Sequence, residues 1–546
     1  MKVGVIGGGL SGLSCASRLQ ELGVAVSLYD TGKRGPGGRA SSRLWRNAPV
    51  DHAAQFAEAR TSTFREFLES LERDGKAKRC PPNAIATLSK PGAVAAPMPE
   101  AIPRFIGVGG MGQIADALAS SITDLRQDIW VSPNGGIRRH NGDGRWIVKE
   151  GKGVESSYDA VVIAHNGKCA ERLTSKQPSR AVHMLLRARF APKLPQKPQP
   201  GGGRMTLNSI YSLLFEVPKG VMPTEQLGEL CTFIQCDDDL RLLSNNAAKH
   251  GGGGGGNGGD TEVWTALSSG TFGKRHKTAQ EFLEGTEVEE EVTRLLLEAV
   301  SRSVGLDANI LTPKTIAASK LQLWGAAQPI NAWVVEGEHG EGKGCCWDAD
   351  NTIGIVGDWI VPSSDNSKDD GDAAWGLPST MESAWLSGRA LAEHLADASS
   401  VKTSCGLMLG KEGGCFDAVD GGGFGEGGGG KAWVSQPSEE RKSGGSGGGS
   451  SRSASPPPRG KENNNDKLFV RNVPYRTTEE EMQTHFETVG KVVSVELLQG
   501  NDGRPRGLAR VRMAKASDAV AVCEALDGKV LSGRQLRIGL DERKRS

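Results

Sequence analysis

Aromatic residues make up only 5% of the 546-residue chain, and no apolar stretch approaches the ~18 consecutive residues that a membrane-spanning helix requires. The ten cysteines have neither the density of a small secreted scaffold nor the paired C-x-x-C spacing of a zinc site. The formal net charge is only +1. We therefore expect no membrane span, no disulfide framework, no metal site and no chain that is basic throughout.

Glycine, in contrast, is abundant at 75 residues and unevenly distributed. Eight of the nine residues in 251–259 are glycine, and this tract separates two apolar runs that predict neighbouring strands, so we expect an extended loop. Residues 399–466 are rich in glycine and serine and are predicted to be a disordered linker. The net charge is −3 for residues 1–401 and +4 for residues 467–546. The linker thus separates a slightly acidic large part from a basic small part.

The chain starts with a strand, a glycine turn and a helix, which together predict a dinucleotide-binding unit. The apolar segment Lys2–Ile6 runs into the pattern G-x-G-x-x-G at Gly7, Gly9 and Gly12. These glycines suit the tight turn, the close approach of the backbone to a pyrophosphate and the packing of helix on strand. A second predicted strand ends at Asp30, where an acid can accept hydrogen bonds from a ribose. No targeting segment is evident before this first strand, so we expect a cytoplasmic protein, with a plastid or nuclear location left open.

Further motifs extend the similarity along the chain. Gly35–Ser41 contains Gly-Gly-Arg just after the acid, Val50–Phe56 reads VDHAAQF, and Ile353–Trp359 is an apolar strand followed by Gly-Asp-Trp. In this order they resemble the flavin amine oxidase superfamily, and within it the renalase-like FAD/NAD(P)-binding oxidoreductases. The resemblance implies FAD as cofactor. The residues that it assigns to cofactor binding, with those of the glycine turn, are Gly7, Gly9, Leu10, Ser11, Gly12, Asp30, Gly38, Arg39, Val131, Gly357, Asp358 and Ser383.

The same resemblance implies the fold and the order of its elements. We expect an α/β protein with a Rossmann-type FAD-binding domain made of residues 1–55, 100–170 and 345–398. A mixed-sheet substrate domain would take residues 56–99 and 171–344. Local patterns predict helices over 113–121 and 281–304, strands over 130–131 and 321–329, and a loop over 271–275.

For the reaction, the resemblance implies oxidation of a reduced nicotinamide dinucleotide or its isomers, with electrons passed to oxygen or another acceptor. Gln55, Trp324 and Trp359 are candidates to lie near the flavin, whereas the catalytic residues stay unknown because a flavin carries the electron chemistry itself. Two alternatives stay open. One is an amine oxidase on the same fold, and the other is an RNA-binding or regulatory protein whose flavin domain senses redox state or a ligand without turnover.

Residues 467–542 predict a second, separate module. The pattern strand, helix, strand, strand, helix, strand resembles the ferredoxin-like α+β fold of an RNA-recognition motif (RRM). Two central strands would carry its RNA-binding residues, and here rings are missing from two positions that usually stack bases. We predict single-stranded RNA as the partner, with a protein partner as the alternative. The candidate RNA-binding residues are Phe469, Arg471, Leu508, Arg510 and Arg512.

Overall fold

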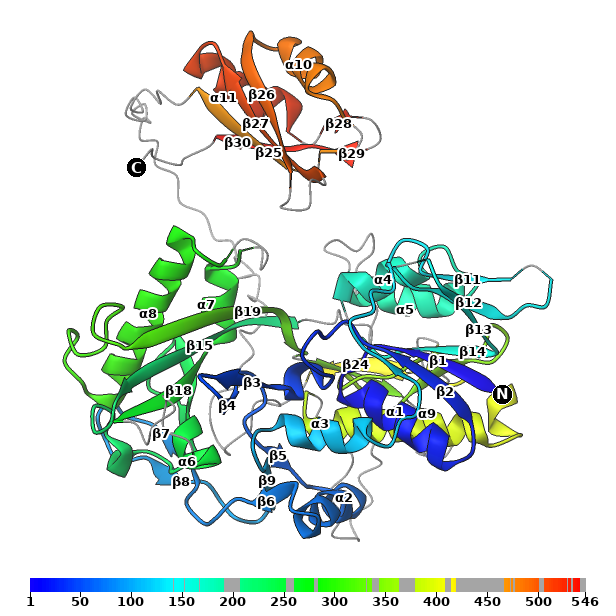
Figure 1. Cartoon of the computed structure of the whole chain (residues 1–546), viewed down its shortest axis with the longest axis vertical. Coiled ribbons are helices and arrows are strands. Elements are labelled where there is room, and N and C mark those ends of the chain that lie inside the picture. Colours follow the sequence, from blue (N-terminus) through cyan, green and yellow to red (C-terminus); the bar gives the residue numbers. More distant parts are fainter. Residues whose placement is uncertain are drawn as a thin grey trace, which may run out of the picture. The chain divides into compact units, whose positions relative to one another are not determined.

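The computed structural model describes residues 1–140, 142–151, 153–165, 167–190, 207–251, 260–278, 283–329, 331–335, 343–362, 379–407, 414–418, 466–471, 473–474, 477–499, 505–527, 529–531 and 534–540. It divides into two compact units, Met1–Glu440 and Arg441–Ser546. The first unit has two lobes, one around β1 and α1 and one around β15 and α8 (Figure 1). The second unit is a small sheet with two helices. Within the described parts of the chain, no helix has both the length and the apolar character needed to cross a membrane.

A six-stranded sheet in the order β10-β2-β1-β14-β22-β21 forms the Rossmann lobe. Its strands are Leu125–Arg126, Ala25–Tyr29, Lys2–Ile6, Ala160–Ile163, Ile353–Ile355 and Cys346–Asp348, and the first five run parallel. Strands separated by more than 300 residues of sequence therefore lie in one sheet. This mixed order, with crossovers between distant strands, is the doubly wound arrangement in which ligands bind at the carboxyl ends of the strands.

Helices cover one face of this sheet. They are α1 (Leu10–Glu21), α3 (Gly112–Ala119) and α9 (Met381–Ala396), and their apolar side chains form one core with Val3 and Val5. Helices α1 and α9 lie side by side (Figure 1). They approach so closely that a Cβ at Gly388 would overlap the carbonyl oxygen of Ser11. The N-terminal and C-terminal motifs are thereby brought together by direct backbone packing.

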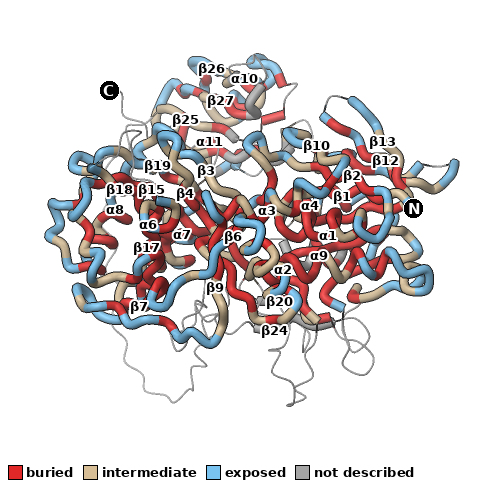
Figure 2. The backbone as a smooth tube through the Cα atoms, turned by 60° about the horizontal axis from the view of Figure 1, so that its bottom comes forward, coloured by how far each residue is buried: buried red, intermediate tan, exposed pale blue. Residues whose placement is uncertain are grey.

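The other face of the Rossmann sheet packs against a small antiparallel sheet and two helices. Buried side chains of Val161 and Ile163 contact this layer, which includes Trp146. Its elements are β11 (Ile137–Arg139), β12 (Trp146–Lys149), β13 (Glu155–Tyr158), α4 (Gly167–Thr174) and α5 (Arg180–Phe190). Buried residues line both faces of β1 and β14, which explains why these strands read as continuous apolar runs. The backbone tube at β1 is accordingly mostly red in Figure 2.

The second lobe is built on a seven-stranded sheet in the order β19-β15-β18-β17-β16-β7-β8. One face packs against α8 (Glu287–Val304), which begins at an N-cap, Thr286, and ends at Gly305 with a positive φ of 76°. The strands are Ala318–Pro329, Leu207–Pro218, Thr261–Ser268, Leu240–Asn245, Cys231–Ile234, Ile85–Leu88 and Ala96–Pro97. We call this the substrate sheet.

Shorter elements connect the two lobes. A hairpin of β3 (Ser42–Trp45) and β4 (Ala48–Asp51) contacts the substrate sheet at β18. A three-stranded sheet, β5-β9-β6, carries α2 (Ser62–Arg73). The remaining elements are β5 (Ala57–Glu58), β6 (Ala77–Arg79), β9 (Arg104–Gly107), α6 (Asn246–His250), α7 (Gly270–Arg275), β20 (Asn331–Val335), β23 (Ile360–Pro362), β24 (Gly414–Ala418) and the 3-10 helices η1 (Gly38–Ala40), η2 (Thr224–Gln226) and η5 (Ser400–Lys402).

The second unit has a four-stranded antiparallel sheet in the order β26-β27-β25-β30. Helices α10 (Glu479–Glu487) and α11 (Ala516–Leu526) pack on one face, with Met482 and Val522 in the core. The strands are β25 (Lys467–Arg471), β26 (Val492–Gln499), β27 (Pro505–Met513) and β30 (Arg537–Leu540), with a small pair β28 (Val530–Leu531) and β29 (Arg534–Gln535). This is the predicted element order, with the small β28–β29 pair in addition.

Three local predictions differ from the structure. Residues 270–275 form helix α7 instead of part of a loop, because Ser269 caps it by accepting a hydrogen bond from the Phe272 N–H at 3.1 Å. Trp130–Val131 is no strand, since Val131 makes one isolated bridge to Glu150. Within the predicted linker, η5 is helical and β24 pairs with β20, so the partner strand decides the structure of that segment. Most of the linker and residues 252–259 lie outside the described residues.

Candidate cofactor site

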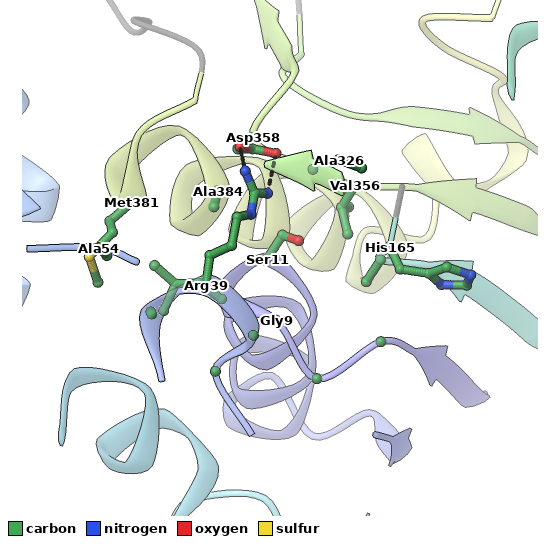
Figure 3. A pocket seen from close by; sticks show the side chains of 18 of the residues that line it. Gly9, Ser11, Arg39, Ala54, His165, Ala326, Val356, Asp358, Met381 and Ala384 are labelled. Carbon is green, nitrogen blue, oxygen red and sulfur yellow. Dashed lines mark hydrogen bonds and ion pairs between the residues drawn. The ribbon is translucent and has the colours of Figure 1, made fainter. Parts of the chain in front are cut away.

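A cavity of about 480 Å³ is lined by both lobes of the first unit. Its walls come from the turn after β1, the segment after β4, the last residues of β19 and the start of α9 (Figure 3). Most of the predicted site residues line it, whereas Gly12 and Ser383 lie outside the lining. The predicted residues in the lining are Gly7, Gly9, Leu10, Ser11, Asp30, Gly38, Arg39, Gln55, Val131, Trp324, Gly357, Asp358 and Trp359.

One end of the cavity is formed by the N-terminus of α1. Its N-cap is Gly9, and no side chain accepts a hydrogen bond from the first turn. Gly7 has a φ of 117°, which favours glycine, and a Cβ at Gly12 would overlap the Gly7 carbonyl oxygen. A Cβ at Gly9 would meet nothing within 4 Å. The backbone is thus open to the cavity here, and a helix N-terminus of this kind binds anions such as phosphate.

Asp30 lies at the carboxyl end of β2, beside this turn. Its carboxylate accepts hydrogen bonds from the N–H groups of Gly8 at 3.2 Å and Gly32 at 3.1 Å. Burial nonetheless raises the pKa of Asp30, partly offset by these N–H groups. The carboxylate therefore fixes the glycine turn and also faces the cavity.

An ion pair crosses the cavity from one motif to the other. Arg39 donates to both carboxylate oxygens of Asp358, from Nη1 at 2.8 Å and from Nη2 at 2.9 Å. Its Nη1 also donates to the carbonyl oxygen of Ala327 on β19 at 2.7 Å. Figure 3 shows the arginine reaching over the start of α1 towards Asp358. One guanidinium therefore joins three chain segments, two of them more than 280 residues away, with the bidentate geometry for which arginine is suited.

The start of α9 forms a second helix N-terminus at the cavity. Ser379, Thr380 and Met381 line it. Thr380 is the N-cap, and its hydroxyl accepts from the Ser383 N–H at 3.0 Å while the Ser383 hydroxyl accepts from the Thr380 N–H at 3.2 Å. Ser383 thus shapes the helix start from outside the cavity lining. The partial positive charge of this helix end faces the cavity.

At the far end of the cavity, Trp324 forms part of the wall and packs against His52, which lies behind it. Trp324 on β19 lies with its ring centroid 5.3 Å from that of His52, and its indole N–H donates to the His52 carbonyl oxygen at 3.2 Å. Burial, with a further contribution from nearby Arg43, lowers the pKa of His52 to about 3, so the ring is neutral at pH 7. Trp359 also lines the cavity, but it is almost fully buried and packs in the core.

A buried cluster of charged and polar groups lies behind the cavity wall. Asp51 accepts from Lys249 Nζ at 2.6 Å, from His250 Nε2 at 2.9 Å, from the Ser42 hydroxyl at 2.6 Å and from the Met111 N–H at 2.8 Å. The side chains of Asp51 and Lys249 are 0% exposed. Although burial opposes it, the Lys249 charge and the His250 hydrogen bond hold the pKa of Asp51 well below its usual range.

This cluster reaches the cavity through Gln55. Lys249 Nζ donates to Gln55 Oε1 at 3.1 Å, and Gln55 Nε2 donates to the carbonyl oxygens of Asp51 and Ala53, each at 3.1 Å. Gln55 was predicted from the sequence, whereas Lys249, His250 and the role of Asp51 were not. A lysine that follows an apolar run looks like a surface residue in the sequence, so only the folded chain reveals it as buried.

Other lining residues were also missed. Trp130 lines the cavity and is 53% exposed. His165 also lines it, with its Nδ1 3.1 Å from the Ile6 carbonyl oxygen. Burial favours the neutral form of the His165 ring and so lowers its pKa. Tyr29 places its hydroxyl 2.6 Å from that of Tyr158. Tyr29 is the last residue of β2, His165 follows the end of β14, and Trp130 precedes Val131. Position at a strand end is the signal that could have identified Tyr29 and His165.

In the second unit, the candidate RNA-binding residues lie on the sheet. Phe469 on β25 is directly opposite Arg510 on β27 and opposite Gly539 on β30. Directly opposite residues project to the same face, and a Cβ at Gly539 would meet nothing within 4 Å. There is thus open space beside the Phe469 ring, on the face of the sheet away from the buried side chains of Leu468 and Val470.

The charged groups of this face are partly paired. Arg510 Nη1 lies 3.5 Å from Glu496 Oε2, and Arg512 Nε lies 2.8 Å from Asp466 Oδ2. Leu508 is 8% exposed, so it offers little surface for a base. The Arg471 side chain lies outside the described residues. The positions of Phe469, Leu508, Arg510 and Arg512 therefore share this face, with Leu508 mostly covered.

Family models match both units. Residues 5–71 match the model of an NAD(P)-binding Rossmann-like domain, and residues 468–537 match that of the RNA recognition motif. The chain thus carries a Rossmann-like nucleotide-binding domain at its N-terminus and an RRM near its C-terminus, as the sequence predicted.

Curated relatives match the RRM. Polyadenylate-binding protein 2 of Arabidopsis thaliana is 41% identical over 71 residues, which are 13% of this chain and 32% of that protein. Cleavage stimulation factor subunit 2 of Homo sapiens is 36% identical over 72 residues, 13% of this chain and 12% of that protein. The match therefore spans only about a tenth to a third of the length of these relatives.

Solved structures are similar at low identity. Putrescine oxidase bound to putrescine is 12% identical, with 72% of this chain and 99% of that chain covered and a TM-score of 0.44. An oxidoreductase from Methanosarcina mazei is 12% identical, with 72% and 100% covered and a TM-score of 0.43. The RNA15 RRM is 22% identical, with 14% and 92% covered and a TM-score of 0.14.

Proposed function

We propose that the first unit is an FAD-dependent oxidoreductase that oxidises a small hydride donor, a reduced nicotinamide dinucleotide or one of its isomers, and passes the electrons to oxygen or another acceptor. The observation that carries this proposal is the cavity itself. It extends from the uncapped N-terminus of α1, past the Arg39–Asp358 pair, to the wall at Trp324. A cavity with backbone N–H groups, an ion pair and an aromatic wall suits a long molecule that has phosphates and a planar ring.

The residues present fit a dinucleotide cofactor. The Gly9 position, where a side chain would enter the cavity, allows a pyrophosphate to approach the backbone. Asp30 lies where a ribose hydroxyl can donate to its carboxylate, and Arg39 supplies a positive charge. Asp358 and the neighbouring start of α9 complete the site from the C-terminal motif.

The chain's own contribution to the reaction is to orient the reactants and exclude water. A flavin held here would supply the hydride acceptor and the route of the electrons to a second acceptor. Phe56, Leu242 and Trp324 give the far end of the cavity an apolar wall, which limits the access of water. The start of α9 provides partial positive charge, which stabilises negative charge that develops in the cavity.

The charges of the lining favour a hydride donor without an ammonium group over an amine. Among the described lining residues, the three carboxylates all have partners. Glu58 accepts from Arg60 and Arg104, each at 2.9 Å, while Asp358 accepts from Arg39 and Asp30 from backbone N–H groups. An ammonium ion that enters a buried site needs an opposite charge. Two of the three carboxylates, Glu58 and Asp358, are already paired with arginines, and the third, Asp30, lies beside the glycine turn.

A spectrum and a set of donors test this function. We expect the purified full-length chain to show the visible absorption of bound flavin, and anaerobic mixing with NADH, NADPH or their isomers to bleach it. A chain that binds no flavin would contradict the proposal. Bleaching by putrescine or another amine, but not by dinucleotides, would favour the amine oxidase alternative. Bound flavin that no donor reduces would favour a sensor.

For the second unit, we propose weakly selective binding of single-stranded RNA through the sheet face of the RRM. Phe469 can stack on a base beside the open space over Gly539, and Arg510 can add its guanidinium plane. Loss of one stacked base costs about 1–3 kcal/mol, so we expect Phe469→Ala to weaken RNA binding about tenfold or more. We expect a smaller loss for Arg510→Ala.

Fluorescence anisotropy with a labelled short RNA measures both variants. Val493→Ala is a suitable control, because that residue is exposed on the same sheet but lies outside the Phe469–Arg510 pair. Unchanged affinity in both Phe469→Ala and Arg510→Ala would reject this surface. In that case a protein partner becomes the better explanation of the module.

A further inference from the structure

The buried cluster behind the cavity contains one feature that the proposed function does not use. Lys249 lies on α6 in the substrate lobe, yet its ammonium group contacts Asp51, the last residue of β4, and Gln55 in the segment that follows the β3–β4 hairpin. A buried ammonium ion is costly unless it is paired and hydrogen-bonded. Here Asp51 supplies the opposite charge and Gln55 supplies a second acceptor.

The cluster also joins the two lobes. The Asp51 carboxylate accepts hydrogen bonds from Ser42 and from the Met111 N–H on one side, and from Lys249 and His250 on the other. Asn246 on α6 adds a further link, since its Oδ1 accepts from the Asp51 N–H at 2.9 Å. The segment that forms this part of the cavity wall, residues 54–56, therefore follows a fixed point at Asp51.

Gln55 lines the cavity, and its three contacts determine which hydrogen-bonding capacity its amide has left. Its Nε2 has two protons, and two carbonyl oxygens lie at hydrogen-bond distance, those of Asp51 and Ala53. Its Oε1 accepts from Lys249, which is a donor only. A flipped amide would place Nε2 against the ammonium group, so Lys249 selects one orientation. In that orientation the remaining capacity of Gln55 is an oxygen lone pair.

We infer that Lys249 is a positioning residue for the cofactor cavity: through Gln55 it fixes this part of the wall as a hydrogen-bond acceptor and prevents it from acting as a donor. The inference rests on the proposed function, because it concerns the end of the cavity at which the ring of the cofactor would lie. It assigns to the substrate lobe a direct part in shaping the cofactor site.

The first test needs no cofactor. Lys249→Met and Gln55→Leu are combined in a double-mutant cycle, and the thermal stability of each variant is measured without added FAD. Residues that act through one another show non-additive effects. We expect the double variant to be clearly more stable than the sum of the two single losses predicts. Additive losses would overturn the inference whether or not the chain binds FAD.

The second test uses the full-length chain loaded with FAD. We expect Lys249→Met to weaken FAD binding about tenfold, which is the effect of losing one hydrogen bond to a charged group. We also expect it to shift the visible absorption bands of the flavin. Gln55→Leu should cause the same shift, and the double variant should show no further change. An unchanged spectrum and affinity in Lys249→Met would overturn the inference.

Arg46→Met is the matched control. Arg46 also joins the β3–β4 hairpin to a buried carboxylate of the substrate sheet, that of Glu216 at 3.3 Å, but neither residue lines the cavity. We expect this variant to leave the flavin spectrum unchanged and FAD affinity within about twofold. Equal effects of Arg46→Met and Lys249→Met would mean that Lys249 only holds the lobes together, which would also overturn the inference.

Should Lys249→Met fail to fold, Lys249→Gln takes its place in both tests, because an amide at this position no longer selects one orientation of Gln55. Gln55→Leu tests the contribution of the Gln55 amide itself. It keeps the Asp51–Lys249 pair and removes only the amide. A chain of normal stability with a shifted flavin spectrum supports the inference, and an unshifted spectrum contradicts it. If the wild-type chain binds no FAD, the proposed function fails, and the cycle without cofactor still decides whether Lys249 acts through Gln55.

Discussion

The two ends of the cavity use different parts of the polypeptide. At the α1 end, the groups that face the cavity are main-chain N–H groups, held open by glycines. At the Trp324 end, the wall consists of side chains, and several are oriented by partners that do not touch the cavity, such as His52 behind Trp324 and Lys249 behind Gln55. The first end depends on the absence of Cβ atoms, and the second depends on buried side-chain contacts.

This difference indicates how each end should respond to change. The glycine turn should tolerate replacement of neighbouring side chains. It should not tolerate a side-chain atom added to one of its glycines, because that atom takes space needed by the main chain or by the molecule in the cavity. A wall of side chains tolerates small volume changes but loses its arrangement when a buried charged or polar partner is removed. The following predictions test whether the two ends differ in this way.

The largest effect is expected at the glycine turn. In Gly12→Ala the new methyl group overlaps the Gly7 carbonyl oxygen, so both the thermal stability and FAD binding should fall, the latter by about 100-fold or more. In Gly9→Ala the methyl group meets no protein atom but enters the cavity. That variant should keep its melting temperature and still lose FAD affinity, as measured by differential scanning fluorimetry and fluorescence titration. Tight FAD binding by Gly9→Ala would contradict the predicted difference between the two ends of the cavity.

A smaller effect is expected where the two motifs meet. Arg39→Lys keeps the positive charge but cannot form two parallel hydrogen bonds to Asp358 while donating to Ala327. We expect FAD affinity to fall about tenfold, which titration of the apoprotein measures. Arg302→Lys is the control, because its guanidinium is 53% exposed and pairs with Asp237 away from the cavity. Equal affinities of the two variants would show that the bidentate geometry is unimportant.

At neutral pH the smallest effect is expected at the far wall, where a loss of stability develops only on acidification. The folded-state pKa of His52 is lowered to about 3, whereas an unfolded histidine has a pKa of ~6.5. Between these values the unfolded chain binds the extra proton. Stability from this residue is therefore complete above pH 6.5 and decreases on acidification, by at most ~1.4 kcal/mol per pH unit. His52→Phe keeps an aromatic ring against Trp324 and should show a shallower decrease.

Tryptophan fluorescence during denaturant unfolding measures this difference. All eleven tryptophans lie between residues 45 and 433, so the signal reports on the first unit alone. Identical pH dependence of wild type and His52→Phe between pH 6.5 and 4 would contradict the assignment of a neutral, buried ring.

The sequence predicted the α1 end of the cavity well, for a physical reason. Gly7, Gly9 and Gly12 lie within six residues, so their spacing alone encodes the turn, and Asp30 follows on the next strand. The motif at Asp358 was also predictable because it is a short strand followed by an acid. What could not be predicted is that Arg39 and Asp358 pair with one another, since that depends on how the intervening residues fold.

The wall at the far end shows the limit of sequence analysis. Lys249 contacts Asp51 across 198 residues, and no local pattern marks it as buried. Helix α7 was missed for a similar reason, because its cap at Ser269 matters only once Phe272 packs against Tyr211. In the RRM, by contrast, nearly every element was predicted, since the fold repeats short strands and helices with regular apolar positions.

The close packing of α1 against α9 has a consequence for synthesis of the protein. The ribosome releases the glycine turn first, whereas Asp358 and the helix that packs on α1 follow more than 300 residues later. At about 5–20 residues per second, the interval is roughly 20–70 s. During that time the α1 surface that α9 will cover, at Ser14 and Cys15, is not protected by its native partner. Completion of the cofactor site is therefore one of the last events in the biogenesis of the first unit.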